Sequence, residues 1–173
     1  ATHITFDATT DTIDTSQLPA VIDGLVYCPG SINLRPFKGL KPEAFKTDLQ
    51  INFISLVKVI QSVLPNLLAS EQASIVAFSS VAATMGMPFH TSVAASKGAI
   101  EGFAKALAAE YAPKIRVNII APSLTDTPLA DKFLNNETKQ EKSAERHPLK
   151  RFGKPEDSAQ MATFLLSDKS SWI

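Results

Sequence analysis

The 173-residue sequence has one cysteine, Cys28, so no disulfide can form within the chain. Lysine and arginine together number 17, and so do aspartate and glutamate, which makes the formal net charge zero. This balance provides neither a basic field for nucleic acid nor a polybasic patch for a membrane surface. Long apolar runs are also missing, because the richest, residues 51–68, is interrupted by Lys58, Gln61 and Pro65. We therefore expect a cytoplasmic protein that binds neither nucleic acid nor a membrane.

Hydrophobic residues make up 45% of the chain and charged residues 20%, a composition typical of a globular domain and unlike that of a disordered tail. The length predicts a single domain over residues 1–173. Short apolar runs at residues 3–7, 22–28, 74–79 and 115–120 predict strands. Apolar residues spaced by three and four predict helices that start at Pro42, near Ser92 and at Pro155. This alternation predicts an α/β fold whose parallel sheet is covered on both faces.

Residues 135–150 are rich in charge and poor in apolar side chains. One interpretation is a solvated helix or mobile loop. The other is a lid that covers substrate at the carboxyl ends of the strands, where ligands bind in such sheets.

Three polar residues have ordinary explanations when each is taken alone. Lys97 extends an apolar helix stripe and could be a lysine that extends its amine to solvent. Ser80, at the end of a strand, could cap a turn. Asn52, within an apolar helix, could be an amide that is satisfied locally.

Together, these residues and their spacing resemble the short-chain dehydrogenase/reductase family. The matching segments, which span nearly the whole chain, are residues 49–53 with Asn52, 75–83 with Ser80, 95–111 with Lys97, and 115–122. Further matches are residues 24–30 to the strand that ends in Asn-Asn-Ala-Gly, residues 122–127 to the Pro-Gly-x-x-x-Thr nicotinamide loop, and residues 151–157 with 164–168 to the late helix.

The resemblance implies a doubly wound, Rossmann-like sheet and hydride transfer between NAD or NADP and a small carbonyl or alcohol substrate. It implies that Asn52, Ser80 and Lys97 are catalytic. It also implies no metal and a homodimer or homotetramer built on the helices from Pro42 and Ser92. The cofactor-binding residues that it implies are Asp7, Gly30, Lys97, Pro122, Leu124 and Thr127.

The sequence departs from the family at its proton donor. The family's tyrosine lies four residues before the lysine and thirteen after the serine, and both spacings lead to Val93. Valine cannot transfer a proton, a role worth roughly 10²–10⁴-fold in rate. Of the residues just before it, His90 is the best possible substitute donor. We expect the cleft around position 93 to be open enough for a tyrosine.

The glycine-rich phosphate loop is also missing, and the resemblance begins at the family's third strand. We therefore expect residues 1–173 to form a single Rossmann-like domain that is incomplete, without its first two strands and its last strand. The missing amino-terminal part would be on the order of 50–60 residues. Three functions stay open: an oxidoreductase with a weakened or rerouted proton donor, a nucleotide-binding pseudoenzyme, and a scaffold without cofactor.

Overall fold

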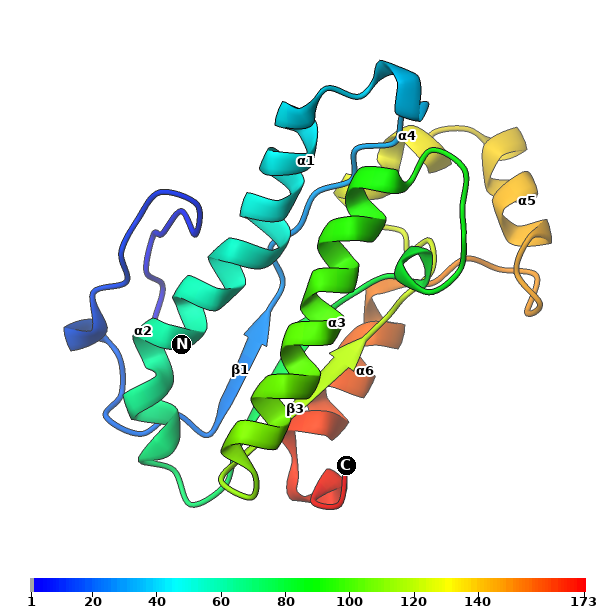
Figure 1. Ribbon diagram of the computed structural model, residues 1–173. Helices are drawn as coiled ribbons and strands as arrows, with labels where there is room; N and C mark the ends of the chain where they lie inside the picture. The colour runs from blue at the N-terminus through cyan, green and yellow to red at the C-terminus, as the bar shows by residue number, and fades with distance from the viewer. Residues whose placement is uncertain (1) are drawn as a thin grey trace.

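The computed structural model describes residues 2–173 and contains one parallel sheet of three strands (Figure 1). The strands are β1 (Gly24–Tyr27), β2 (Ala73–Phe78) and β3 (Ile115–Ile120), and their order in the sheet is β1-β2-β3. Leu25 pairs with Ile75, which in turn pairs with Val117. These strands confirm three of the four predicted from apolar runs, and they confirm the parallel α/β class.

The fourth predicted strand, residues 3–7, is wrong, because the chain there is irregular. A strand is stable only with a hydrogen-bonded partner, and this segment pairs with no strand among residues 2–173. Asp7 instead begins a turn, in which its carbonyl accepts from Asp11 N at 2.8 Å. Phe6, Ala8 and Ile13 still pack against the core.

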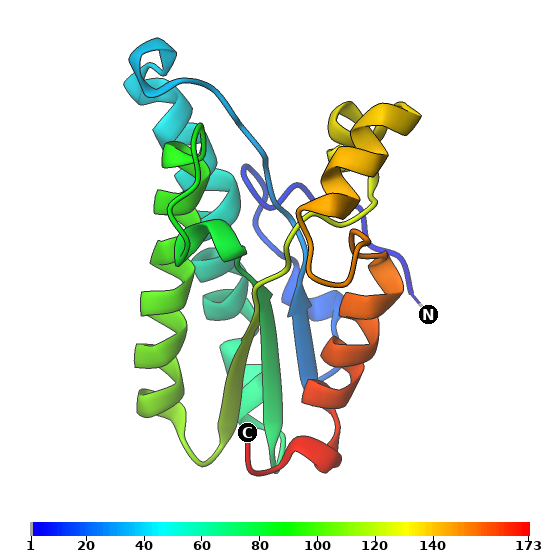
Figure 2. The ribbon, with the colours of Figure 1, turned by 90° about the vertical axis from the view of Figure 1, so that its right-hand side faces the viewer.

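Helices cover both faces of the sheet (Figure 2). One face carries α1 (Pro42–Leu49), α2 (Ser55–Leu68) and α3 (Thr91–Tyr111), and the other carries α6 (Pro155–Leu166). Alternate side chains of a strand point to opposite faces. Ile75 accordingly packs in the large core with α2 and α3, while Val76 packs against α6.

The apolar faces match the predicted periodicity in part. On α3 the stripe through Lys97, Ile100 and Ala104 is buried, as expected. On α6, where the sequence places apolar residues at Met161, Phe164 and Leu165, only Leu165 and the neighbouring Ala162 are buried, and Met161 and Phe164 are exposed.

The long helix from Pro42 is interrupted by a π turn at Gln50–Ile54, in which Ser55 N bonds to Gln50 O. This turn inserts one residue and rotates the preceding helix relative to α2. Phe45 and Leu49, which belong to the apolar spacing of the helix from Pro42, are therefore only half-buried, while Asp48 and Asn52 are fully buried.

By length and composition alone, the helical stretch Pro42–Leu68 could also cross a membrane. That is weak evidence, since core helices of soluble proteins pass the same test, and this one packs Leu56, Ile60 and Leu67 in the core.

Two short helices, α4 (Asp131–Leu134) and α5 (Glu137–Glu145), stand beyond the carboxyl ends of the strands (Figure 2). No residue of α5 is buried. The position fits the lid interpretation of residues 135–150, and the exposure fits a solvated helix. The remaining elements are 3₁₀ turns at Thr15–Gln17, Phe37–Gly39, Val81–Ala83, Pro128–Ala130 and Asp168–Ser170.

Candidate functional site

Lys97 lies at the centre of the carboxyl edge of the sheet. Its Nζ donates to the carbonyl of Phe78, the last residue of β2, at 2.8 Å. The side chain is 9% exposed, and burial lowers the pKa of Lys97 to about 8. The only ion pair within residues 2–173 joins Arg151 to Asp157, so Lys97 has no carboxylate beside it there. A lysine held in this way is prepared to donate hydrogen bonds to a ligand.

Gly30 brings Asn52 and Lys97 to a common point after β1. A Cβ atom on Gly30 would lie 3.4 Å from Asn52 Oδ1 and 3.5 Å from Lys97 Nζ. Three residues that the sequence predicted separately thus meet in the structure, and the bare backbone of Gly30 leaves room for a ligand beside Lys97.

Asn52 is completely buried in the π turn, and both its amide oxygen and its amide nitrogen are hydrogen-bonded. Its Oδ1 accepts from Ser31 N at 2.9 Å, and its Nδ2 donates to Ser31 Oγ at 3.2 Å and to Ser96 Oγ at 2.8 Å. Because Ser96 precedes Lys97 on α3, Asn52 connects the loop after β1 to the helix that carries the lysine.

Sequence reasoning missed Asp48, which extends this cluster. The carboxylate is 1% exposed and accepts from Ser31 Oγ at 2.6 Å and from Ser92 Oγ at 2.5 Å. The available signal was spacing: Asp48 lies four residues before Asn52, and Ser92 lies four before Ser96, so each pair shares a helix face.

Ser80 starts the 3₁₀ turn after β2, and its Oγ accepts from Ala82 N at 3.2 Å. The capping interpretation of Ser80 is therefore confirmed. The cap uses an oxygen lone pair and leaves the hydroxyl proton for another acceptor. Its neighbour Ser79 is buried and donates to Glu101 Oε1 at 2.7 Å.

No tyrosine hydroxyl serves this edge of the sheet within residues 2–173. Val93 is only 4% exposed, so the expectation of an open cleft around it is wrong for the valine side chain. Tyr27 is equally buried and donates to Ile51 O at 3.0 Å, and burial raises the pKa of this phenol. Tyr111 ends α3, five turns from position 93. His90 precedes α3, with its Nδ1 at 2.7 Å from Pro88 O.

The loop after β3 carries the remaining predicted residues. Pro122 O accepts from Val81 N at 3.2 Å, which joins this loop to the residue after Ser80. Leu124 O accepts from Gly153 N at 2.9 Å, and Thr127 occupies the position just before the next 3₁₀ turn without a side-chain capping bond. Asp7, in contrast, lies with Tyr27 and Pro29 along a separate hollow of about 460 Å³.

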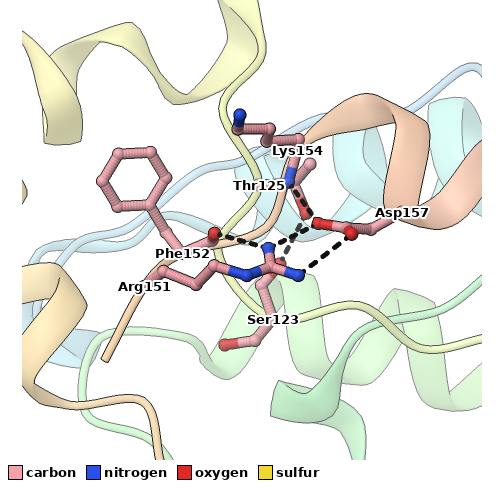
Figure 3. A network of polar contacts seen from close by, with 6 residues as sticks. All are labelled: Ser123, Thr125, Arg151, Phe152, Lys154 and Asp157. Atoms are coloured by element: carbon pink, nitrogen blue, oxygen red, sulfur yellow. Dashed lines mark hydrogen bonds and ion pairs between the residues drawn. The ribbon is translucent and has the colours of Figure 1, made fainter. Parts of the chain in front are cut away.

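An ion pair between Arg151 and Asp157 holds the segment 151–157, which contacts the loop of residues 122–127 (Figure 3). Arg151 binds Asp157 through two contacts, of 2.6 and 3.0 Å, and Lys154 N donates to the same carboxylate at 2.8 Å. These donors, first the Arg151 guanidinium, lower the pKa of Asp157 to about 2. A single bridge between Thr125 and Gly153 then ties the segment to the loop.

These residues fit one end of a nicotinamide dinucleotide. Lys97 offers a donor without a counter-ion, Gly30 offers close backbone approach, and residues 122–127 form a polar loop beside them. Residues 2–173 contain no group of three or more His, Cys, Asp or Glu that could hold a metal ion.

Comparison with known proteins places the chain in a family. A family model described as "Enoyl-(Acyl carrier protein) reductase" matches residues 5–173. The FabG 3-oxoacyl-(acyl-carrier-protein) reductase of Thermotoga maritima is 39% identical over 153 residues, which are 88% of this chain and 61% of that protein. The 2-(S)-hydroxypropyl-CoM dehydrogenase 3 of Xanthobacter autotrophicus is 30% identical over 172 residues, 96% of this chain and 68% of that protein.

Solved structures agree. A short-chain dehydrogenase/reductase from Brucella melitensis matches with a TM-score of 0.82 and 32% identity, over 88% of this chain and 61% of that one. Ligand-free aldohexose dehydrogenase from Thermoplasma acidophilum matches with a TM-score of 0.86 and 25% identity, over 96% and 69%. The chain thus spans about three fifths of the length of several relatives, and it belongs to the short-chain dehydrogenase/reductase family of oxidoreductases.

Proposed function

We propose that the protein carrying this chain is a cytoplasmic NAD(P)-dependent oxidoreductase that interconverts a small carbonyl compound and its alcohol. The observation that carries the proposal is the buried Lys97, which lies beside Gly30 and Asn52 without a carboxylate partner among the described residues. A buried, uncompensated amine costs stability, so its place at the ligand-binding edge of the sheet points to a ligand. The activities named for the relatives from T. maritima and X. autotrophicus support the class of reaction.

Each site residue has a defined role in this proposal. The dinucleotide supplies or accepts the hydride when bound. Lys97 donates to its nicotinamide ribose, and Asn52 orders the loop after β1 through Ser31. Ser80 donates its free hydroxyl proton to the substrate oxygen and thereby orients the carbonyl.

The remaining residues hold the cofactor. The loop residues Pro122, Leu124 and Thr127 flank the carboxamide, and the exposed carboxylate of Asp7 accepts from the adenine amino group. Substrates are small molecules, and the protein acts as a homodimer or homotetramer through α3 and the helical stretch Pro42–Leu68, which comprises α1, the π turn and α2. Residues 1–173 form one Rossmann-like domain without the family's first two strands and last strand.

Calorimetric titration of the full-length protein with NAD and NADP tests the proposal. We expect measurable binding that weakens at least about tenfold in Lys97→Ala, because the ribose loses a charge-assisted hydrogen bond. The matched control is Lys105→Ala, an exposed lysine on the same helix, which should bind like the parent. No heat and no thermal shift at millimolar dinucleotide would instead favour a scaffold.

A second candidate, a nucleotide-binding pseudoenzyme, is favoured by Val93. A buried valine where the family has its phenol leaves no proton donor at that position. Dinucleotide binding without turnover of any carbonyl or alcohol in a broad panel would identify this case.

A further inference from the structure

We propose that His147 and Ser123 form the proton-donating pair of this site, in place of the phenol that is missing at position 93. The inference rests on the proposed oxidoreductase function and identifies the residues that would complete it. The two side chains are 24 residues apart in sequence, and Ser123 Oγ lies 2.8 Å from His147 Nε2.

The imidazole of His147 is held at both nitrogens. Its Nδ1 lies 2.7 Å from the carbonyl oxygen of Ser143. A carbonyl oxygen can only accept, so Nδ1 carries a proton in every charge state of the ring. In the neutral ring Nε2 is then an acceptor for the Ser123 hydroxyl, and in the charged ring Nε2 donates to Ser123 Oγ. Fixing one nitrogen in this way orients the other for proton transfer.

Ser123 of the pair lies on the loop that adjoins the turn of Ser80, the serine proposed to orient the carbonyl. Ser123 follows Pro122, whose carbonyl accepts from Val81 N, and Val81 follows Ser80. Ser80 and Ser123 therefore lie on adjoining loops beyond β2 and β3, where ligands bind in parallel sheets. The Ser123 side chain points away from the Arg151–Asp157 ion pair (Figure 3), so it is not part of that contact.

The solvent exposure of Ser123 and His147 is also compatible with proton transfer to a substrate. Ser123 is exposed and can reach a substrate, whereas the half-buried His147 remains open to solvent for renewal of its proton. The other candidates lack this combination. Tyr27 is buried and bonded to Ile51 O, and the Asp48 carboxylate is 1% exposed behind two serine hydroxyls. Among residues 2–173, the His90 ring has a polar contact with Pro88 alone, two residues away in its own loop.

The proton transfer balances in the direction of reduction, with NAD(P)H as the reductant. The carbonyl carbon gains the hydride, and the electron pair of the C=O π bond moves to oxygen. That oxygen takes the proton of the Ser123 hydroxyl, while Ser123 Oγ takes the proton from Nε2 of charged His147. The ring becomes neutral with Nδ1–H still bound to Ser143 O, and solvent returns a proton to Nε2.

The test compares variants of the full-length protein by the rate of NAD(P)H oxidation with a panel of carbonyl substrates. We expect His147→Ala and His147→Gln to lower kcat by about 100-fold, the scale of general acid catalysis, with unchanged dinucleotide affinity and melting temperature. Glutamine can still bond Ser123 but cannot carry the proton. Added imidazole should restore activity to His147→Ala, which a purely structural role would not allow.

Two further measurements separate the pair from its surroundings. In long-range ¹H–¹⁵N spectra, His147 should be in the Nδ1–H form when neutral, and its Nε2 signal should shift in Ser123→Ala. In the double variant Val93→Tyr/His147→Ala, the new phenol should make the activity at least about tenfold higher than in His147→Ala alone. His3→Ala, an exposed histidine far along the chain, is the matched control.

The possible failures are distinct. If the parent is active and His147→Ala keeps its kcat, or if the loss occurs only in His90→Ala, the proposed pair is wrong while the oxidoreductase function stands. If the parent binds dinucleotide and reduces nothing, the proposed function is wrong and the inference falls with it.

Discussion

The amine of Lys97 donates to the carbonyl of Phe78 at 2.8 Å, and this contact ties α3 to the end of β2. The bond satisfies one of the three donors of the ammonium group. Because the described residues place no carboxylate beside it, the charge is compensated by neutral dipoles alone. Lys97 therefore lowers stability in the absence of a ligand, and this cost can be measured.

Lys97→Met should stabilise the unliganded protein. Burial lowers the pKa of Lys97 from 10.5 to about 8. Below pH 8 both the folded and unfolded states hold the proton, and the full desolvation cost is present, at most about 3 kcal/mol. Between pH 8 and 10.5 the unfolded state binds more protons, so the stability of the parent rises with pH.

The gain from Lys97→Met, on the order of 1–3 kcal/mol at pH 7, should therefore shrink towards pH 10.5. Urea unfolding at pH 7, 9 and 10.5 measures it, with Lys105→Met as the exposed control. A gain that stays constant across this range would contradict the assignment.

Asp48→Ala should destabilise the protein by about 2–4 kcal/mol, because Ser31 and Ser92 lose their acceptor in a buried site. Asp48→Asn keeps the volume and one acceptor oxygen, so its loss should be about half as large. Glu43→Ala, an exposed change on the same helix, should stay within about 0.5 kcal/mol. Chemical denaturation gives all three values, and equal losses at positions 43 and 48 would refute the role of the cluster.

Val93→Tyr should raise carbonyl reduction at least about tenfold, or about 1.4 kcal/mol of barrier. Lys97 lies one helical turn away and should lower the pKa of the new phenol. Since Val93 is 4% exposed, the ring must displace neighbours, and we expect a stability loss of about 1–3 kcal/mol. Activity assays and melting curves are run together. A variant that folds and binds dinucleotide but stays inactive on every substrate supports the pseudoenzyme.

Gly102→Glu should weaken self-association without unfolding the protomer. A Cβ atom at Gly102 meets no atom within 4 Å, so the fold accepts a side chain there. A charged side chain would block the close approach of α3 to a second copy. Light scattering at micromolar concentration should show a smaller species than the parent. Gly39→Glu, equally open and outside α2 and α3, is the control. A monomeric parent would rule out the assembly.

The sequence predicted those strands and helices that can be recognised from the local order of apolar and polar residues. Strands 22–28, 74–79 and 115–120 stand out as apolar runs, and the stripe on α3 follows from spacing. The strand at residues 3–7 could not be judged in this way, because pairing depends on a partner strand and not on composition. A single inserted residue at the π turn likewise leaves no mark in the sequence, so the buried face of α1 was misplaced.

The family motifs singled out Asn52, Gly30 and Lys97 in the sequence, and the structure places these three residues together. Asp48 was missed because a charged residue in a helix ordinarily faces solvent. The contact between Ser123 and His147 joins positions 24 apart and follows from no local spacing rule.

The π turn at Gln50–Ile54 has a consequence for insertions and deletions. Successive residues of an α-helix are rotated by about 100°, so one extra residue turns all of α1 by that angle relative to α2. Deleting one residue between 50 and 54 would restore a regular helix, swing Asp48 away from Ser31, and take the Ile51 carbonyl from Tyr27. The length of this segment therefore sets which side chains of α1 face Ser31 and the sheet.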